Sequence, residues 1–330
     1  MLKSWTFGLV AAASLAFAAI AHAEPIQLQQ ISADAKWAAH LDVDALMASE
    51  TIKGIRQKCL ENCEQAENYL SMLAAVWRFD PTTDLHGITI YGTQFKPKTG
   101  VAIVHANVDQ QMLLDKVAQA PCHEAAKYGD FELHSWTHAA GTKHERSMTG
   151  TFFKPNIMVF GATPDEVKAA LDVLDGSKPS FDGSETGLSL MLPPGTIMTV
   201  GAIGLSDCDL PGKSPLAKKI NAMVLAIGQE QSDICMAGQV VMKDASLGQE
   251  MKSVIDGGLA FAKIAKSNDP ELLKLLDAFQ VSVADKAVNV EWRAPAEEVF
   301  AGLHKAAAEA KKAHKEWQER MKSKSCPKDK

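Results

Sequence analysis

The order of the predicted secondary-structure elements repeats on the two sides of one linker, and this repeat constrains the fold more than any other feature of the chain. The linker, residues 177–185, is a polar run rich in Ser, Gly and Pro, a composition typical of loops between structural units. On each side of it, an extended segment is followed by a helix, then by antiparallel strands and a further helix. The sequence therefore predicts an α+β fold of two similar halves, 24–176 and 186–295, each a mainly antiparallel sheet covered by helices.

One continuous α+β domain is the alternative arrangement. The two halves share the order of their elements but no clear residue identity, so the pattern alone does not establish an internal duplication. The chain has 330 residues, of which 46% are hydrophobic, and this is enough apolar material for two domain-sized cores or for one large core. Both arrangements therefore stay open at the level of the sequence.

Strands are predicted where apolar and polar residues alternate, and helices where a capping residue precedes an amphipathic run. Thr163-Pro164-Asp165-Glu166 is a capping box with proline at the first helical position, and Asp44 is the predicted cap of a long helical region over 45–76. The predicted strands are 37–43, 85–91, 101–108, 128–137, 148–160, 196–203, 234–242, 281–283 and 287–292. The other predicted helices are 110–118, 215–227, 247–265, one from 270, and a charged C-terminal helix and tail in 296–330.

The first 23 residues have the three regions of a secretory signal peptide. Lys3 provides a positive charge, residues 5–20 form an apolar run, and Ala21-His22-Ala23 places small residues at both positions of a cleavage site. An uncleaved membrane anchor is the alternative, because the apolar run approaches the length of a spanning helix. No later segment approaches that length, so we expect an exported chain that begins at Glu24, has no transmembrane segment after cleavage, and resides in the periplasm or outside the cell.

The cysteines indicate disulfides. They are Cys59, Cys63, Cys122, Cys208, Cys235 and Cys326. An even number of cysteines in an exported protein favours cross-linking, although six cysteines allow 15 connectivities. Cys208 and Cys235 could join neighbouring elements of the second half, whereas Cys59 and Cys63, four residues apart in a helical pattern, would be strained as a pair. Because the chain contains no C-x-x-C motif, we expect a structural role rather than redox catalysis.

Familiar catalytic motifs are missing from the sequence. The chain has no G-x-x-x-x-G-K-[ST] phosphate loop, no G-x-G-x-x-G fingerprint, no H-E-x-x-H helix and no G-x-S-x-G nucleophile elbow. Distant residues can still assemble an active site, so this observation lowers the expectation of an enzyme without excluding one.

A group of three histidines, His134, His138 and His144, is the candidate metal site. His134 and His138 are an even number of residues apart, so they would share one face of a strand. Three neutral imidazoles can bind zinc or copper and leave a position open for water. The alternative is a polar strand edge followed by an exposed turn, because Glu132 and Glu145 are the only acidic residues close by in the sequence.

Charge is unevenly distributed along the chain. The net charge of −6 argues against nucleic acid as the main partner, since nucleic-acid binding requires a concentrated basic surface. Residues 301–330 nevertheless carry nine Lys or Arg and four Asp or Glu. This basic helix could contact an acidic surface, such as anionic lipid headgroups or an acidic polymer. Alternatively, it is a solvated helix whose charges pair with the acidic body of the protein.

Three segments resemble an uncharacterised family of bacterial exported proteins. They are Trp-Ala-Ala-His-Leu-Asp-Val-Asp-Ala-Leu at 37–46, Leu-His-Gly-Ile-Thr-Ile-Tyr-Gly at 85–92, and the helix end at 171–176. The resemblance covers roughly residues 35–181. It implies export and an α+β fold, and it brings no activity or catalytic residues with it.

Together, these observations favour an exported, non-enzymatic protein that binds an unidentified ligand or associates with a component of the cell envelope. The second hypothesis is a metal-dependent hydrolase that uses His134 and His138 with zinc or copper. The third is a surface-association protein that uses the basic C-terminal helix.

Overall fold

The computed structural model of the protein describes residues 25–54, 72, 74–75, 78–96, 99–184, 186–188, 192–205 and 217–324. The predicted signal peptide lies outside the described residues, and so do Cys59, Cys63, Cys208 and Cys326.

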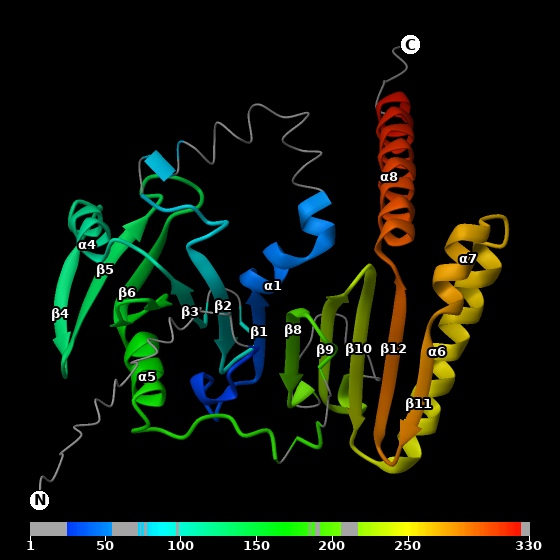
Figure 1. Ribbon diagram of the computed structural model, residues 1–330, viewed down its shortest axis with the longest axis horizontal. Coiled ribbons are helices and arrows are strands. Elements are labelled where there is room, and N and C mark those ends of the chain that lie inside the picture. Colours follow the sequence, from blue (N-terminus) through cyan, green and yellow to red (C-terminus); the bar gives the residue numbers. More distant parts are fainter. Residues whose placement is uncertain are drawn as a thin grey trace, which may run out of the picture.

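In the described ranges, twelve strands form one antiparallel sheet in the order β11-β12-β10-β9-β8-β1-β2-β3-β7-β6-β5-β4 (Figure 1). The strands of the first half are β1 (Trp37–Asp42), β2 (Leu85–Gly92), β3 (Val101–Ala106), β4 (Glu124–Tyr128), β5 (Phe131–His138), β6 (Arg146–Lys154) and β7 (Ile157–Gly161). Those of the second half are β8 (Thr196–Ile203), β9 (Ile220–Glu230), β10 (Asp233–Met242), β11 (Gln280–Ala284) and β12 (Ala287–Pro295). Together with the helices, this sheet makes the protein an α+β fold.

The two halves of the chain meet at β1. Ala39 of β1 pairs with Ile90 of β2 on one side and with Val200 of β8 on the other. The sequence left open whether the two halves share a sheet, and the structure has one continuous sheet, the arrangement of the alternative prediction. The physical reason is that pairing β1 with β8 satisfies the backbone groups that each strand would otherwise expose at the edge of its own sheet.

The halves still resemble each other in strand order. The meander β1-β2-β3 is followed in the sheet by β7, and the meander β8-β9-β10 is followed by β12. In each half, the last strand of the half precedes a helix, α5 (Pro164–Leu174) or α8 (Ala296–Lys324). An internal duplication stays a prediction.

Helices cover the two ends of the sheet on opposite faces. Besides α5 and α8, the described helices are α1 (Val43–Ala48), α4 (Gln110–Ala118), α6 (Ala245–Ala265) and α7 (Pro270–Asp277), with short 3-10 helices η1 (Leu28–Gln30) and η3 (Ala217–Lys219). α5 packs with Ile103 and Val159, both 0% exposed, in the main core. On the other face, Met251 of α6 packs against Val288 of β12 in a second cluster. Cross-strand register places Ile103 and Val288 on opposite faces of the sheet.

The predicted helix over 215–227 is wrong. In its described part, residues 217–219 form η3 and the chain then continues as β9, in which Ala222 and Ala226 are completely buried. The run Asn-Ala-Met-Val-Leu-Ala-Ile is almost uniformly apolar, so its periodicity does not separate a buried strand from a helix. The segment is a strand because it pairs with both β8 and β10.

Two predicted extended segments are hairpins rather than single strands. The segment 148–160 contains β6 and β7, separated by a turn at Pro155 and Asn156. The segment 128–137 contains most of β5, which is preceded by an unpredicted strand, β4, and a turn at Gly129 with a φ of 57°. This backbone conformation suits glycine because it has no Cβ.

The cap predicted for the first helix is also misplaced. The helix starts at Val43, two residues earlier than expected, so Asp42 is the capping residue and its Oδ1 accepts a hydrogen bond from the Ala45 N–H at 2.7 Å. Asp44 instead pairs with His86 at 3.0 Å. The capping box at Thr163 and Glu166, by contrast, is present as predicted.

Two of the cysteines lie in the described part of the chain, and both carry free thiols. Cys122 is exposed in the turn before β4, and Cys235 is buried in β10. The structure therefore contains no disulfide between described residues, and Cys235, the candidate partner of Cys208, is free. In the described ranges, no helix is both long and apolar enough to cross a membrane.

Candidate functional site

The predicted metal site is not assembled. His134 lies inside β5, His138 ends that strand, and His144 lies in the exposed turn that follows. His134 instead contacts His123, with 3.1 Å between Nδ1 and Nε2 and the two rings stacked. Burial lowers the pKa of His134, and the neighbouring His123 lowers it further against the opposing effect of Glu132. Among the described residues, no group of three His, Cys, Asp or Glu side chains has an arrangement that could hold a metal ion.

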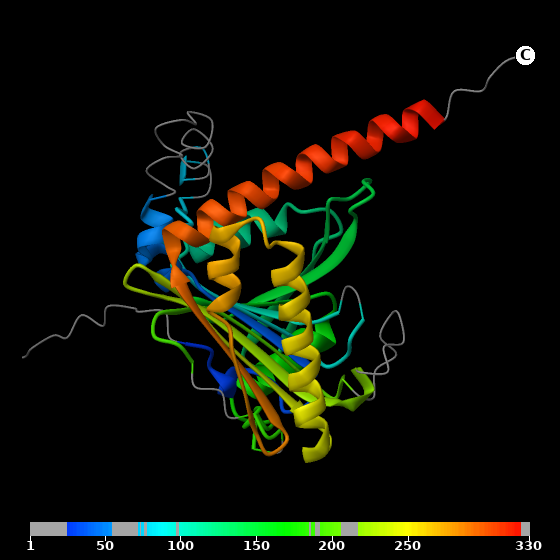
Figure 2. The same ribbon diagram turned by 90° about the vertical axis from the view of Figure 1, so that its right-hand side faces the viewer.

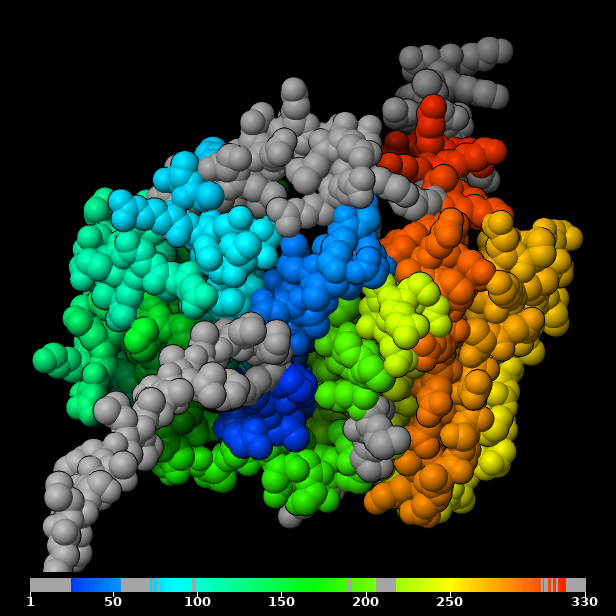
Figure 3. Space-filling model, in the orientation of Figure 1, coloured from blue at the N-terminus to red at the C-terminus, as the bar shows by residue number. Residues whose placement is uncertain are grey.

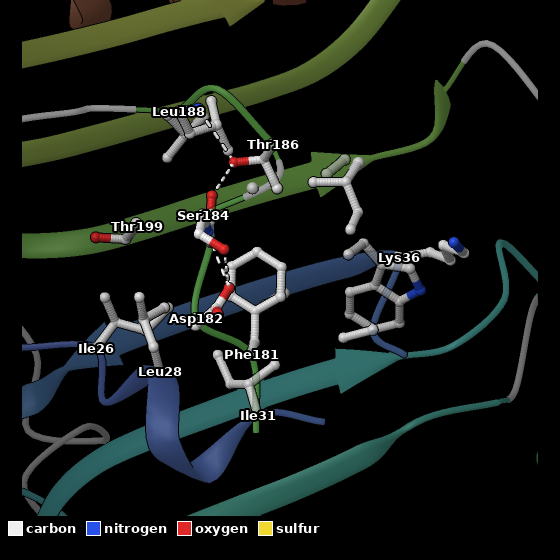
Figure 4. A pocket seen from close by; sticks show the side chains of 18 of the residues that line it. Ile26, Leu28, Ile31, Lys36, Phe181, Asp182, Ser184, Thr186, Leu188 and Thr199 are labelled. Atoms are coloured by element: carbon white, nitrogen blue, oxygen red, sulfur yellow. Dashed lines mark hydrogen bonds between the residues drawn. The ribbon is translucent and has the colours of Figure 1, made fainter. Parts of the chain in front are cut away.

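The structure reveals an apolar cavity of about 440 Å³ at the junction of the two halves (Figure 4). It lies over β1, β8 and β9, and its walls come from the N-terminal segment and from the predicted linker. A cavity of this size is in the range of sites for small molecules. Its apolar walls include Ile26, Leu28, Ile31, Phe181 and Leu188.

Paired residues of β1 and β8 form the floor of the cavity. Ala38 lies opposite Gly201 in the sheet, and both have small or absent side chains. A Cβ added to Gly201 would meet its nearest neighbour, the Met223 carbonyl oxygen, only at 3.5 Å, which is ordinary van der Waals contact. The open space above the floor therefore depends on the missing side chain at Gly201.

The predicted linker forms a wall of the cavity rather than a simple connection. The Phe181 N–H donates to the Ile31 carbonyl oxygen at 2.7 Å, and the Ala33 N–H donates to the Pro179 carbonyl oxygen at 3.1 Å. In Figure 3 the N-terminal segment, deep blue, lies beside green residues of this region. These bonds hold Ile31 and Phe181 together over the sheet.

Most polar groups of the cavity wall are satisfied within the wall itself. Asp182 Oδ1 accepts from both the N–H and the hydroxyl of Ser184, each at 2.9 Å, and these bonds lower the pKa of Asp182. The Thr186 hydroxyl donates to the Gly183 carbonyl oxygen at 2.7 Å and accepts from the Leu188 N–H at 3.1 Å. These side chains maintain the shape of the loop.

Thr199 is the exception. It belongs to the floor, is 4% exposed, and its Oγ1 has no hydrogen-bond partner within the part of the chain that the structure describes. Figure 4 shows it on β8, beside the cavity. A buried hydroxyl without a partner costs about 1–3 kcal/mol. In its described part, the cavity thus combines a mostly apolar lining, which also includes Lys36, with one buried hydroxyl that lacks a partner.

Sequence reasoning did not find this site. Ala38 and Gly201 are far apart in the chain and become neighbours only through the pairing of β1 with β8. The one local signal was the linker itself, because a polar loop that contains Phe181 has an aromatic residue to bury.

The protein therefore has an α+β fold and an apolar cavity whose volume is typical of small-molecule sites. Comparison with protein families and with curated proteins gives no match. Among solved structures, crystal form III of TP0453 is similar, with a TM-score of 0.46 and 10% sequence identity over 84% of this chain and 98% of that chain. Crystal form I of TP0453 is similar with a TM-score of 0.42 and 9% sequence identity, over 84% of this chain and 96% of that chain. Similarity at this level says nothing about ligand or activity.

Proposed function

We propose that the protein is an exported binding protein that holds a small apolar molecule in the cavity between β1, β8 and the 177–185 linker. Export rests on the signal-peptide pattern of the first 23 residues. The observation that carries the binding role is an apolar cavity of about 440 Å³ whose floor contains the Thr199 hydroxyl, which has no partner among the described residues.

The composition of the cavity indicates the chemistry of the ligand. An apolar body gains about 25 cal/mol for each Å² of surface that leaves water. One hydrogen-bonding atom on the ligand would satisfy Thr199 Oγ1, which otherwise has no described partner. We therefore expect a mostly apolar ligand with a single polar group, such as a medium-chain alcohol.

Filling the cavity tests this proposal. In Gly201→Leu, a side chain grows from the floor into the ligand space, while the extended backbone of β8 accepts it. The probe is N-phenyl-1-naphthylamine, whose fluorescence rises in apolar surroundings, and dodecan-1-ol should displace it from the unmodified protein. We expect Gly201→Leu to weaken binding of the probe by about tenfold or more, which corresponds to about 1.4 kcal/mol.

Gly238→Leu is the matched control. Gly238 lies in β10, and the register through Leu225 and Val200 places it on the face opposite to Gly201. A Cβ at Gly238 would also meet its nearest neighbour at ordinary contact distance, 3.6 Å. The control should bind the probe as the unmodified protein does. Unchanged binding in a folded Gly201→Leu protein would contradict the proposal.

A second candidate function, association with an acidic surface, is supported by the placement of α8. Beyond Gly302, every α8 side chain that is described is exposed, and the helix extends away from the body of the protein (Figure 2). Among the described residues, three ion pairs tie the first half of α8 to the body, Glu298 to Lys274, Lys305 to Asp269 at 2.7 Å and Glu309 to Lys266 at 3.2 Å. This leaves the basic outer part of the helix accessible to a partner.

A further inference from the structure

A second cavity, of about 420 Å³, lies over the opposite ends of β1 and β2 and is lined by polar side chains. It is bounded by the N-terminal segment, by strands β1 to β3, and by the turn between β6 and β7. Three histidines contribute to its lining, His40, His86 and His105, and Lys154 lies at its rim. None of them belongs to the candidate sites predicted from the sequence.

The floor of this polar cavity is buried and ordered by hydrogen bonds. His40 is 7% exposed and Thr89 is 2% exposed, and 2.9 Å separates His40 Nδ1 from Thr89 Oγ1. Gly87 lies beside them, where an added Cβ would meet His40 Cε1 at 3.5 Å. The glycine therefore leaves room for a side chain beside the His40 ring.

The other two histidines are held in fixed orientations. Nδ1 of His86 donates to Asp44 at 3.0 Å, and its Nε2 accepts from the Asn107 amide at 2.8 Å. His105 Nε2 donates to Gln30 Oε1 at 3.1 Å. Such partners determine the tautomer and the orientation of an imidazole ring. The polar cavity is thus lined by side chains whose positions are set before any ligand binds.

Among the described residues, the lining contains basic side chains and no acidic one, although the Asp44 carboxylate contacts His86. Every ionisable side chain that the structure places in it is basic, namely Lys154 and the three histidines, although the protein as a whole carries a net charge of −6. Lysine is a strong donor to carboxylate and phosphate oxygens, and the amide groups of Gln29 and Asn156 in the same lining are donors as well. An anionic group therefore fits this cavity better than a neutral or cationic one.

We propose that the polar cavity binds a carboxylate or phosphate group. This group can belong to a small free anion or to the head of an amphiphile whose apolar part fills the apolar cavity. The second source is possible because one segment lines both cavities, with Leu28 facing one and Gln30 the other. His40 and Thr199 are also directly paired across β1 and β8. The binding of an amphiphile across both cavities rests on the proposed function, whereas the binding of an anionic group in the polar cavity does not depend on it.

Isothermal titration of the mature protein with inorganic phosphate tests the anion site. Gly87→Leu fills the polar cavity from its floor and should weaken phosphate binding by about tenfold or more. Lys154→Gln removes a rim charge and should weaken it by about threefold, a modest effect because Lys154 is exposed. Lys143→Gln, an exposed lysine in the turn after β5, is the matched control and should leave the affinity unchanged.

Dodecyl phosphate separates the two sources of the anionic group. If the group is the head of an amphiphile, dodecyl phosphate binds at least about tenfold more tightly than phosphate, and Gly87→Leu and Gly201→Leu both weaken it. If the group is a free anion, the two compounds bind equally and Gly201→Leu has no effect. Either result supports the site.

The proposal is overturned if neither Gly87→Leu nor Lys154→Gln weakens the binding of phosphate or dodecyl phosphate. Because Lys154 is exposed, its substitution keeps the fold and decides the question even if Gly87→Leu does not fold. Dodecan-1-ol carries no anion, so its binding, and its loss in Gly201→Leu, tests the proposed function separately.

Discussion

Thr199 and Thr151 are both buried threonines within the sheet, but their hydroxyl groups have opposite energetic roles. Thr151 is 5% exposed and its hydroxyl donates to the Glu132 carbonyl oxygen at 2.8 Å. Thr199 is 4% exposed and its Oγ1 has no partner among the described residues. The first hydroxyl stabilises the fold, and the second reduces its stability unless a ligand supplies the missing bond.

We therefore expect Thr199→Val to stabilise the ligand-free protein by about 1–2 kcal/mol, since valine has the same shape and buries no polar atom. Thr151→Val should destabilise it by about 1 kcal/mol, because the carbonyl oxygen loses its donor. Urea unfolding of protein that has been stripped of ligand by unfolding and refolding measures both changes. If Thr199→Val proves as destabilising as Thr151→Val, the hydroxyl has a partner in the native state.

At the scale of elements, α8 is a helix in which every described side chain beyond Gly302 is exposed. Lys311, Lys312 and Lys315 are exposed on it, and they lie beyond Glu309, the outermost of its three described ion-pair residues. Each lysine near an anionic lipid surface contributes about 1 kcal/mol, and salt screens the attraction over about 10 Å at 0.1 M ionic strength. The three lysines together give the helix a measurable, salt-sensitive affinity for such a surface.

Replacing these three lysines by glutamine should weaken sedimentation with phosphatidylglycerol vesicles by about a hundredfold at low salt. Vesicles of phosphatidylcholine should bind neither protein. The control replaces Lys96, Lys127 and Lys143, which are exposed on other elements, and removes the same charge from the protein. If both triple variants lose binding equally, net charge rather than α8 is responsible, and the second candidate function fails.

Elements with local signals could be predicted from the sequence, and elements that depend on distant partners could not. Thr163 and Glu166 mark the start of α5 within four residues, and the structure contains the capping box in full. β9 contains no such signal, because a uniformly apolar run becomes a strand only through its neighbours β8 and β10. Both cavities also depend on distant partners. Their floors require the register of β1 with β2 and with β8, which no local pattern specifies.

At the scale of the whole molecule, β1 makes the two halves one structural unit. It is flanked by β2 on one side and by β8 on the other, and the apolar cavity lies over this junction. The N-terminal segment also bonds to the linker that leads into the second half. A ligand in the cavity would therefore contact both halves and stabilise both, rather than one of two independent domains.

We accordingly expect the mature protein to unfold in one cooperative transition. Trp136 in β5 reports on the first half and Trp292 in β12 on the second, and 5-fluorotryptophan labelling makes each visible by fluorine NMR during urea titration. The two resonances should lose intensity at the same urea concentration. Ala39→Pro interrupts β1 where it pairs with both neighbours, costs about 3 kcal/mol or more, and should lower both midpoints together by about 1 M or more. Two separate midpoints, or a shift confined to Trp136, would instead identify the halves as independently folding units that merely share a sheet.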